Sequence, residues 1–169
     1  MRSISFILLS LVLAVSASAQ QILKPGDAAP NFVNQALDGH TYSLNQLQGK
    51  IVVLTFWSTR CAICHAEIPK LNQVVQHYKG QEVVFLGVTM DNEVKVDPFI
   101  RKNPFNFSIL PNAFGIMLQY ADKDRDGNIN MGFPANFLID RHGRVAARTS
   151  GWDSAQNVDA EVGKLLGSD

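Results

Sequence analysis

Residues 56–69 of the chain are FWSTRCAICHAEIP, and they contain its only two cysteines, Cys61 and Cys64. The apolar run before the cysteines, residues 51–56, predicts a strand that is buried on both faces. The polar segment after them, up to Tyr78, predicts a helix. The cysteines therefore stand where a buried strand is followed by a helix, at the C-x-x-C spacing of a redox-active pair.

The position of the pair at a helix N-terminus predicts different roles for its two sulfurs. Unpaired N–H groups and the positive end of the helix dipole favour a thiolate at Cys61, which is therefore the expected nucleophile. Cys64 lies one turn further along the same face, close enough to resolve a mixed disulfide formed at Cys61. Glu67 follows Cys64 by three residues and so lies on the same helix face as the two cysteines. Its carboxylate is therefore the candidate base that takes the proton of Cys64 and returns it on reduction. The alternative for Glu67 is an ordinary solvated helix residue.

The N-terminal residues 1–19 have the pattern of an export signal. Arg2 is followed by an apolar stretch of about ten residues and then by Ala17-Ser18-Ala19, which provides a small-residue cleavage site. A helix that spans a bilayer needs about twenty apolar residues, so this stretch does not predict a membrane anchor. We expect a signal peptide at residues 1–19 and one domain of ordinary size at residues 20–169, soluble in the periplasm after cleavage.

The charge balance gives no sign of a nucleic-acid partner. The chain has 15 Lys and Arg residues and 15 Asp and Glu residues, so its formal net charge is zero. Two closely spaced cysteines in an exported chain do not make a disulfide framework. They therefore either take part in thiol-disulfide exchange or bind a ligand. His40, His77 and His142 stand singly, and we expect no zinc or other metal site.

The rest of the sequence predicts an α/β fold in which a central mixed sheet is flanked by helices. An N-terminal β-hairpin is expected around Asp38-Gly39, and a buried strand at residues 83–90 completes a parallel β-α-β unit with the strand at residues 51–56. The other expected elements are helices at 97–102 and 113–120, a strand at 107–110, a hairpin of strands at 135–139 and 144–149, and a last helix capped by Ser154 and ending near Leu166. This order places helices on both faces of one sheet.

Four segments together resemble a known family. They are residues 26–32 with 37–39, the strand with Phe56-Trp57, the series Cys61-x-x-Cys64-x-x-Glu67-x-Pro69, and residues 132–143. In this order they resemble the thioredoxin superfamily, in particular its exported TlpA/ResA-like thiol-disulfide oxidoreductases with a redoxin or AhpC-TSA-like domain.

The resemblance implies a thioredoxin-like fold and a protein-disulfide reductase that needs no cofactor. It implies that Pro134 is a cis-proline facing the cysteines, that the backbone of Phe133 pairs with a substrate strand, and that Glu67 is the family's acidic residue near the active site. The side chains of Trp57 and Phe133 are expected to line the substrate groove. The implied partners are protein thiols and disulfides, in cytochrome c maturation or general periplasmic thiol homeostasis, and a membrane thiol reductant that recharges the pair.

The chain departs from the family pattern at two places. Arg60 stands where the family usually has a tryptophan, and a guanidinium beside Cys61 favours the thiolate, so Arg60 is a candidate for tuning the redox potential. The second departure is an acidic insert at residues 121–130, whose aspartates match the first half of a calcium loop. Phe133 occupies the place of the bidentate glutamate of such a loop, so a solvated acidic loop is the other interpretation.

Three rival interpretations stay open. Cys61 to His65 also match a c-type haem attachment site with His65 as an iron ligand, although a covalent porphyrin would displace the packing of the sheet. A peroxidase of the peroxiredoxin kind shares the fold, but Leu54 and Ser58 occupy the places of its pocket proline and threonine. The third is a thioredoxin-fold binding module in which Cys61 and Cys64 form a structural disulfide.

Overall fold

The computed structural model describes residues 22–124 and 126–168, and the signal peptide expected at residues 1–19 lies outside them. The elements in chain order are β1 (Val33–Gln35), β2 (Thr41–Ser43), the 3₁₀ helix η1 (Leu44–Leu47), β3 (Ile51–Phe56), α1 (Ala62–His77), β4 (Val83–Val88), α2 (Glu93–Lys102), β5 (Ser108–Leu110), α3 (Phe114–Tyr120), β6 (Asp122–Lys123), β7 (Ile129–Asn130), β8 (Ala135–Ile139), β9 (Val145–Ser150) and α4 (Ser154–Leu166). Within the described ranges, no helix combines the length and apolar character needed to cross a membrane.

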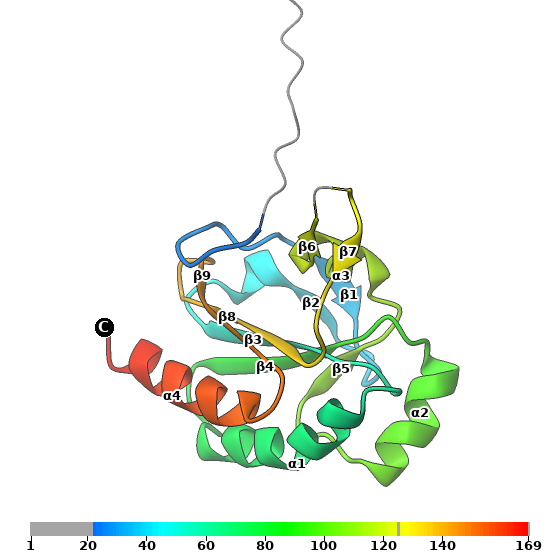
Figure 1. Ribbon diagram of the computed structural model, residues 1–169. Helices are drawn as coiled ribbons and strands as arrows, with labels where there is room; N and C mark the ends of the chain where they lie inside the picture. Colours follow the sequence, from blue (N-terminus) through cyan, green and yellow to red (C-terminus); the bar gives the residue numbers. More distant parts are fainter. Residues whose placement is uncertain (1–21, 125, 169) are drawn as a thin grey trace, which may run out of the picture.

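The central sheet has five strands in the order β5-β4-β3-β8-β9, with helices on both faces (Figure 1). β3, β4 and β5 run parallel, whereas β8 pairs antiparallel with β3, and β9 pairs antiparallel with β8. The sheet is mixed because α1 carries the chain across between β3 and β4, while a short turn joins β8 to β9. β1 and β2 form the expected N-terminal hairpin. The expected α/β fold, with a central mixed sheet, flanking helices and an N-terminal β-hairpin, is therefore confirmed.

β3 is the middle strand, and every one of its residues is buried. Leu54 and Phe56 belong to the core on the α3 side of the sheet, whereas Val53 belongs to the core that α1 and α4 cover. Side chains alternate along a strand, so Thr55 and Trp57 point to the same face as Val53. The strand thereby places Thr55 and Trp57 beneath the N-terminal half of α1, beside Cys64.

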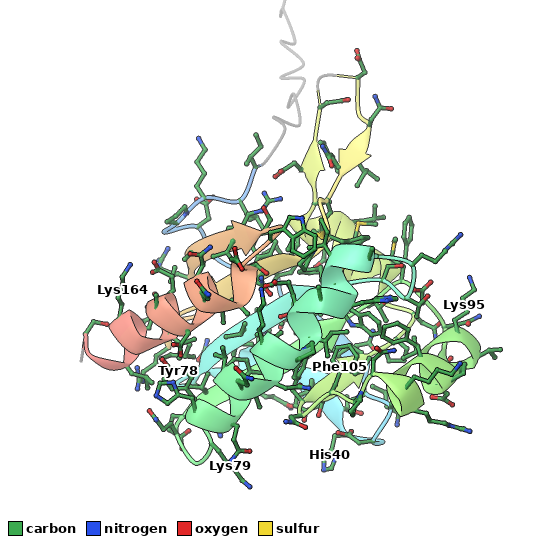
Figure 2. The ribbon with its side chains drawn as sticks, turned by 60° about the horizontal axis from the view of Figure 1, so that its bottom comes forward. His40, Tyr78, Lys79, Lys95, Phe105 and Lys164 are labelled. Carbon is green, nitrogen blue, oxygen red and sulfur yellow. A yellow bond between two sulfur atoms is a disulfide. The ribbon has the colours of Figure 1, made fainter. Side chains whose placement is uncertain are left out.

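α1 and α4 lie side by side on one face of the sheet (Figure 2). Tyr78, which follows the last residue of α1, donates a hydrogen bond from its hydroxyl to the backbone carbonyl of Asp159 in α4 at 2.9 Å. At the other end of the contact, the backbone N–H of Ala155 donates to Oε2 of Glu67 at 3.1 Å. The apolar residues between these two points are Leu71, Val74, Val158 and Val162. The packing therefore brings the first turn of α4 against Glu67 on α1.

Two helix starts differ from those expected from the sequence. α2 begins at Glu93 instead of residue 97, because Oδ1 of Asn92 accepts a hydrogen bond from the backbone N–H of Lys95 at 3.2 Å and caps an earlier turn. The prediction that Ser154 caps α4 is wrong, because Ser154 is the first helical residue and Asp153 precedes it as the cap. The hydroxyl of Ser154 lies 3.4 Å from Glu67 Oε2. A tertiary partner thus holds the side chain that was expected to make a local cap.

The acidic insert forms a small antiparallel hairpin of β6 and β7. The carboxylate of Asp122 accepts hydrogen bonds from Nη1 of Arg148 at 2.7 and 2.8 Å. Oδ1 of Asp124 accepts from the backbone N–H groups of Asp126 and Asn128, each at 2.9 Å. Among the described residues, no group of three or more His, Cys, Asp or Glu side chains is placed to hold a metal ion. The contacts of Asp122 and Asp124 favour a solvated hairpin over a calcium loop.

Candidate active site

The two cysteines lie at the start of α1, joined by a disulfide whose Cα atoms are 5.2 Å apart. Cys61 is the N-cap residue, and its Sγ accepts a hydrogen bond from the backbone N–H of Cys64 at 3.0 Å. After reduction, the same helix N-terminus favours a thiolate on Cys61. Cys61 is partly exposed, whereas Cys64 is only 2% exposed. The sulfur of Cys61 is therefore the one that a substrate can reach.

Asp91, a residue that the sequence analysis missed, holds the turn before Cys61. Its Oδ2 accepts hydrogen bonds from the backbone N–H of Thr59 at 2.8 Å, from the hydroxyl of Thr59 at 2.9 Å and from the hydroxyl of Ser58 at 3.1 Å. Burial pushes the pKa of Asp91 upward, but these hydrogen bonds, with Lys95 nearby, outweigh it and hold the pKa below its ordinary value. The position of Asp91 just after a buried parallel strand was the available signal, since such strand ends often carry site residues.

Glu67 is buried on the other side of the cysteine pair, with 4% of its surface exposed. Its Oε1 accepts from Nζ of Lys70 at 2.9 Å, and its Oε2 accepts from the backbone N–H of Ala155 at 3.1 Å. Burial raises the pKa of the Glu67 carboxyl, but the hydrogen bonds from Lys70 and Ala155 and the charge of Lys70 outweigh it, so the net pKa lies below the ordinary value. The solvated alternative for Glu67 is therefore wrong, because α4 covers this face of α1.

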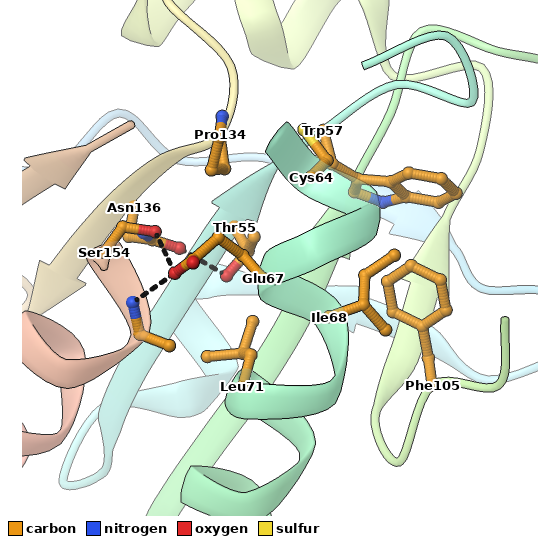
Figure 3. A pocket seen from close by; sticks show the side chains of 11 residues that line it. Thr55, Trp57, Cys64, Glu67, Ile68, Leu71, Phe105, Pro134, Asn136 and Ser154 are labelled. Carbon is orange, nitrogen blue, oxygen red and sulfur yellow. Dashed lines mark hydrogen bonds between the residues drawn. The ribbon is translucent and has the colours of Figure 1, made fainter. Parts of the chain in front are cut away.

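Glu67 and Cys64 line one small pocket, which we call the Cys64 pocket (Figure 3). The pocket has a volume of about 20 Å³, which is room for one water molecule. The floor contains Thr55, whose hydroxyl donates to Oδ1 of Asn136 at 2.7 Å. Its other lining residues include Trp57, Pro134 and Ser154. The arrangement places a carboxylate and the inner cysteine around the same volume, which leaves room for one water to carry a proton between them.

Pro134 lies opposite the N-terminal end of α1, and the Phe133–Pro134 peptide bond is cis, as the family resemblance implied. The carbonyl of Pro134 accepts a hydrogen bond from the backbone N–H of Gly151 at 3.0 Å, which fixes the loop to the end of β9. Among the hydrogen bonds of the described residues, none uses the backbone N–H or C=O of Phe133. These two groups are free to pair with an extended segment of another chain. The side chain of Phe133 is half-buried beside them.

Trp57 lies in the core, where the sequence analysis expected a residue of the substrate groove. It is 1% exposed, and its ring centroid lies 5.3 Å from that of Phe99 and 4.7 Å from that of Phe105. Gly87 on the neighbouring strand makes room for it, since a Cβ there would come within 3.1 Å of the indole Nε1. The expected groove contact is corrected to a supporting one, because the alternation along β3 turns the indole inward beneath Cys64.

Arg60 and His65 flank the cysteine pair at the surface. Both side chains are exposed, and the backbone N–H of Arg60 donates to Oγ of Ser58 at 3.3 Å. Nε2 of His65 donates to the carbonyl of Thr59 at 3.0 Å, and the imidazole centroid lies 4.7 Å from that of Phe99. His65 therefore steadies the turn before Cys61, which favours a redox pair over a haem attachment site.

The fold around this pair is that of thioredoxin-like thiol-disulfide oxidoreductases, and the reachable Cys61 beside the buried Cys64 fits their exchange chemistry. The chain belongs to the AhpC/TSA family, whose model matches residues 25–148. Among curated relatives, it is 31% identical to the thiol-disulfide oxidoreductase ResA of Geobacillus kaustophilus over 139 residues, which cover 81% of this chain and 75% of the relative.

Two solved structures support the same class. A thiol:disulfide interchange protein of the thioredoxin family from Chlorobium tepidum is 25% identical with a TM-score of 0.69, covering 87% of this chain and 100% of the other. A secreted disulfide oxidoreductase of Mycobacterium tuberculosis, homologous to E. coli DsbE, is 27% identical with a TM-score of 0.63, covering 79% of this chain and 96% of the other. The protein is a thiol-disulfide oxidoreductase of the ResA/DsbE type with Cys61 and Cys64 as its redox pair.

Proposed function

We propose that the protein is exported to the periplasm, where it reduces disulfides of protein substrates and is recharged by a membrane thiol reductant. The export pattern of residues 1–19 supports the location. The likeness to a ResA protein and to a secreted DsbE homologue supports a role in cytochrome c maturation or in periplasmic thiol homeostasis. The unequal exposure of the two cysteines is the observation that carries the proposal.

The reaction begins with the reduced protein. The Cys61 thiolate attacks one sulfur of a substrate disulfide, so that a Cys61–substrate bond forms and the other substrate sulfur leaves as a thiolate. The thiol of Cys64 then gives its proton to the Glu67 carboxylate and attacks Sγ of Cys61. The Cys61–Cys64 disulfide forms, and the second substrate sulfur leaves. The substrate gains two electrons from the cysteine pair, and the membrane reductant later supplies two electrons that reduce the Cys61–Cys64 disulfide through a second exchange at Cys61.

Substrate binding in this proposal uses the cis-proline loop. The free backbone N–H and C=O of Phe133 pair with an extended substrate segment, and Pro134 holds that segment against Cys61. The half-buried ring of Phe133 supplies apolar contact at the rim. Because main-chain pairing recognises no particular side chain, this mode suits protein substrates of varied sequence.

Trapping with single-cysteine variants tests the proposal. Cys61→Ser should abolish reduction of an insulin-type disulfide, because no reachable nucleophile remains. Cys64→Ser should stop after the first exchange and accumulate mixed disulfides, which mass spectrometry of periplasmic extracts identifies. The double variant is the matched control for adducts that do not depend on Cys61. Catalytic turnover by Cys64→Ser would overturn the role assignment, and a wild-type disulfide that resists dithiothreitol would favour a structural bond.

A further inference from the structure

The carboxylate of Glu67 joins two helices of the molecule. It stands on α1, accepts a hydrogen bond from the N-terminal turn of α4 through Ala155, and pairs with Lys70 one turn further along α1. Figure 3 shows the carboxylate between α1 and the start of α4, with the Ser154 hydroxyl directed toward it. Both carboxylate oxygens are thereby held, so the group keeps one orientation at the edge of the Cys64 pocket.

Lys70 is the cation of this arrangement. Its Nζ lies 2.9 Å from Oε1 of Glu67 and also 2.9 Å from Oδ1 of Asp153, the residue before α4. The Lys70 side chain is 42% exposed, so it can pair with the buried Glu67 while its ammonium still contacts water. The hydrogen bonds and charges of the two carboxylates raise the pKa of Lys70 above its ordinary value, which shows that both favour the charged lysine.

The charges around Glu67 are few. On α1 the ionisable neighbours are Cys64 and Lys70, and from the α4 side the charged neighbour is Asp153. The strands beneath contribute only the neutral side chains of Thr55 and Asn136. Lys70 is therefore the cation that pairs with Glu67 among the described residues. A thiolate that forms on Cys64 faces a carboxylate whose charge Lys70 offsets.

We propose that Lys70 is a positioning residue for the second exchange step, which acts on Cys64 only through Glu67 by fixing the carboxylate and compensating its charge. The inference rests on the proposed role of Glu67 and adds the partner that makes this role possible. Without Lys70, a nearly buried anion beside Cys64 repels the developing thiolate. With Lys70 in place, the carboxylate stays ionised and fixed in position, and the charge of Lys70 offsets its repulsion of the developing thiolate. Asp153 steadies the exposed side of Lys70 and does not face the sulfur.

A titration of Cys64 alone tests the inference. In a Cys61→Ala background, Cys64 is the single thiol of the chain, and its ultraviolet thiolate absorbance against pH gives its pKa. Glu67→Gln should lower the pKa of Cys64 by about one unit, because a like charge is removed. Lys70→Met should raise it by a similar amount, whereas Lys70→Arg should restore the parent value. Asp153→Asn is the matched control and should leave it within a few tenths of a unit.

The double variant Glu67→Gln/Lys70→Met decides whether Lys70 acts through Glu67. Its Cys64 pKa should equal that of Glu67→Gln alone, because the lysine then has no carboxylate to compensate. The inference is overturned if Lys70→Met still changes the pKa of Cys64 in the Glu67→Gln background. It is also overturned if Lys70→Met leaves that pKa unchanged in the parent background. If Glu67→Gln itself leaves the pKa of Cys64 unchanged, the carboxylate does not influence the sulfur. The proposed role of Glu67 then fails, and not only that of Lys70. Thermal melts of each variant show whether a pKa change reflects altered folding.

Discussion

Two buried carboxylates flank the redox pair, and their surroundings differ. Asp91 accepts three hydrogen bonds from the neutral groups of one turn, Ser58 and Thr59, so it holds the backbone that leads into Cys61. Glu67 accepts from a lysine and from the start of a second helix, and it lines the pocket that contains Cys64. The pKa of each lies below its ordinary value. Glu67 lines the Cys64 pocket and Asp91 does not, so the contrast separates a structural carboxylate from one placed for chemistry.

The largest expected effect comes from Glu67→Gln, which keeps the shape of the side chain and removes the base. We expect disulfide exchange near neutral pH to slow by roughly ten- to a thousandfold because glutamine cannot accept the Cys64 proton during the attack, with a smaller loss at high pH, where hydroxide takes that proton. Rates measured across the pH range check this expectation. Asp91→Asn is the matched comparison, and any loss it causes should be independent of pH. A pH-independent loss in Glu67→Gln would remove the distinction between the two carboxylates.

Asp91 should matter more for stability than for the pH profile. Asp91→Ala leaves two hydroxyls and one backbone N–H of the turn without their acceptor, and we expect a loss of about 1–3 kcal/mol in the free energy of unfolding. Urea unfolding of the oxidised variant measures it. Asp91→Asn, which keeps an acceptor oxygen, should lose less. An Asp91→Ala protein as stable as the parent would show that the turn does not depend on this carboxylate.

Acid should weaken the fold through both carboxylates. Their folded-state pKa values lie below their ordinary values, so the stability they contribute is fully present above the unfolded-state pKa, near 4. It is lost as the pH falls through the lower, folded-state values. We expect the urea midpoint of the oxidised protein to fall steadily below about pH 4. The double variant Glu67→Gln/Asp91→Asn should show a flatter decline, and an equal slope in both proteins would contradict this account.

The smallest expected effect belongs to Arg60, which lies outside both carboxylate networks. Its exposed guanidinium favours the reduced, thiolate form of Cys61 and so raises the redox potential, but solvent screens it. Arg60→Trp should therefore make the protein more reducing by at most about 30 mV, which corresponds to about one pKa unit. The glutathione equilibrium of both forms measures the difference, with Arg60→Lys as the charge-preserving control. An unchanged or higher potential in Arg60→Trp would remove Arg60 from the mechanism.

The sequence by itself determined the elements whose signals are local. The continuous apolar run at residues 51–56 became β3 with the same bounds, and Asp38-Gly39 marked the hairpin of β1 and β2. The position of Cys61 at the helix N-terminus followed from the same strand-to-helix order. The family pattern located the cis-proline at Pro134. In each case the information lies within a few neighbouring residues or in a recognised series of them.

The tertiary structure decided which groups surround the sulfurs. Glu67 and Ala155 are 88 positions apart, and Asp91 and Thr59 are 32 apart, so no local pattern could reveal either contact. Ser154 was predicted to cap its own helix because a serine at a helix start usually does so, but packing of α4 on α1 brought Glu67 to it instead. Trp57 carried no sign of its burial, which depends on three aromatic side chains meeting from distant segments. Local patterns specify elements, whereas burial and hydrogen-bond partners depend on how those elements pack.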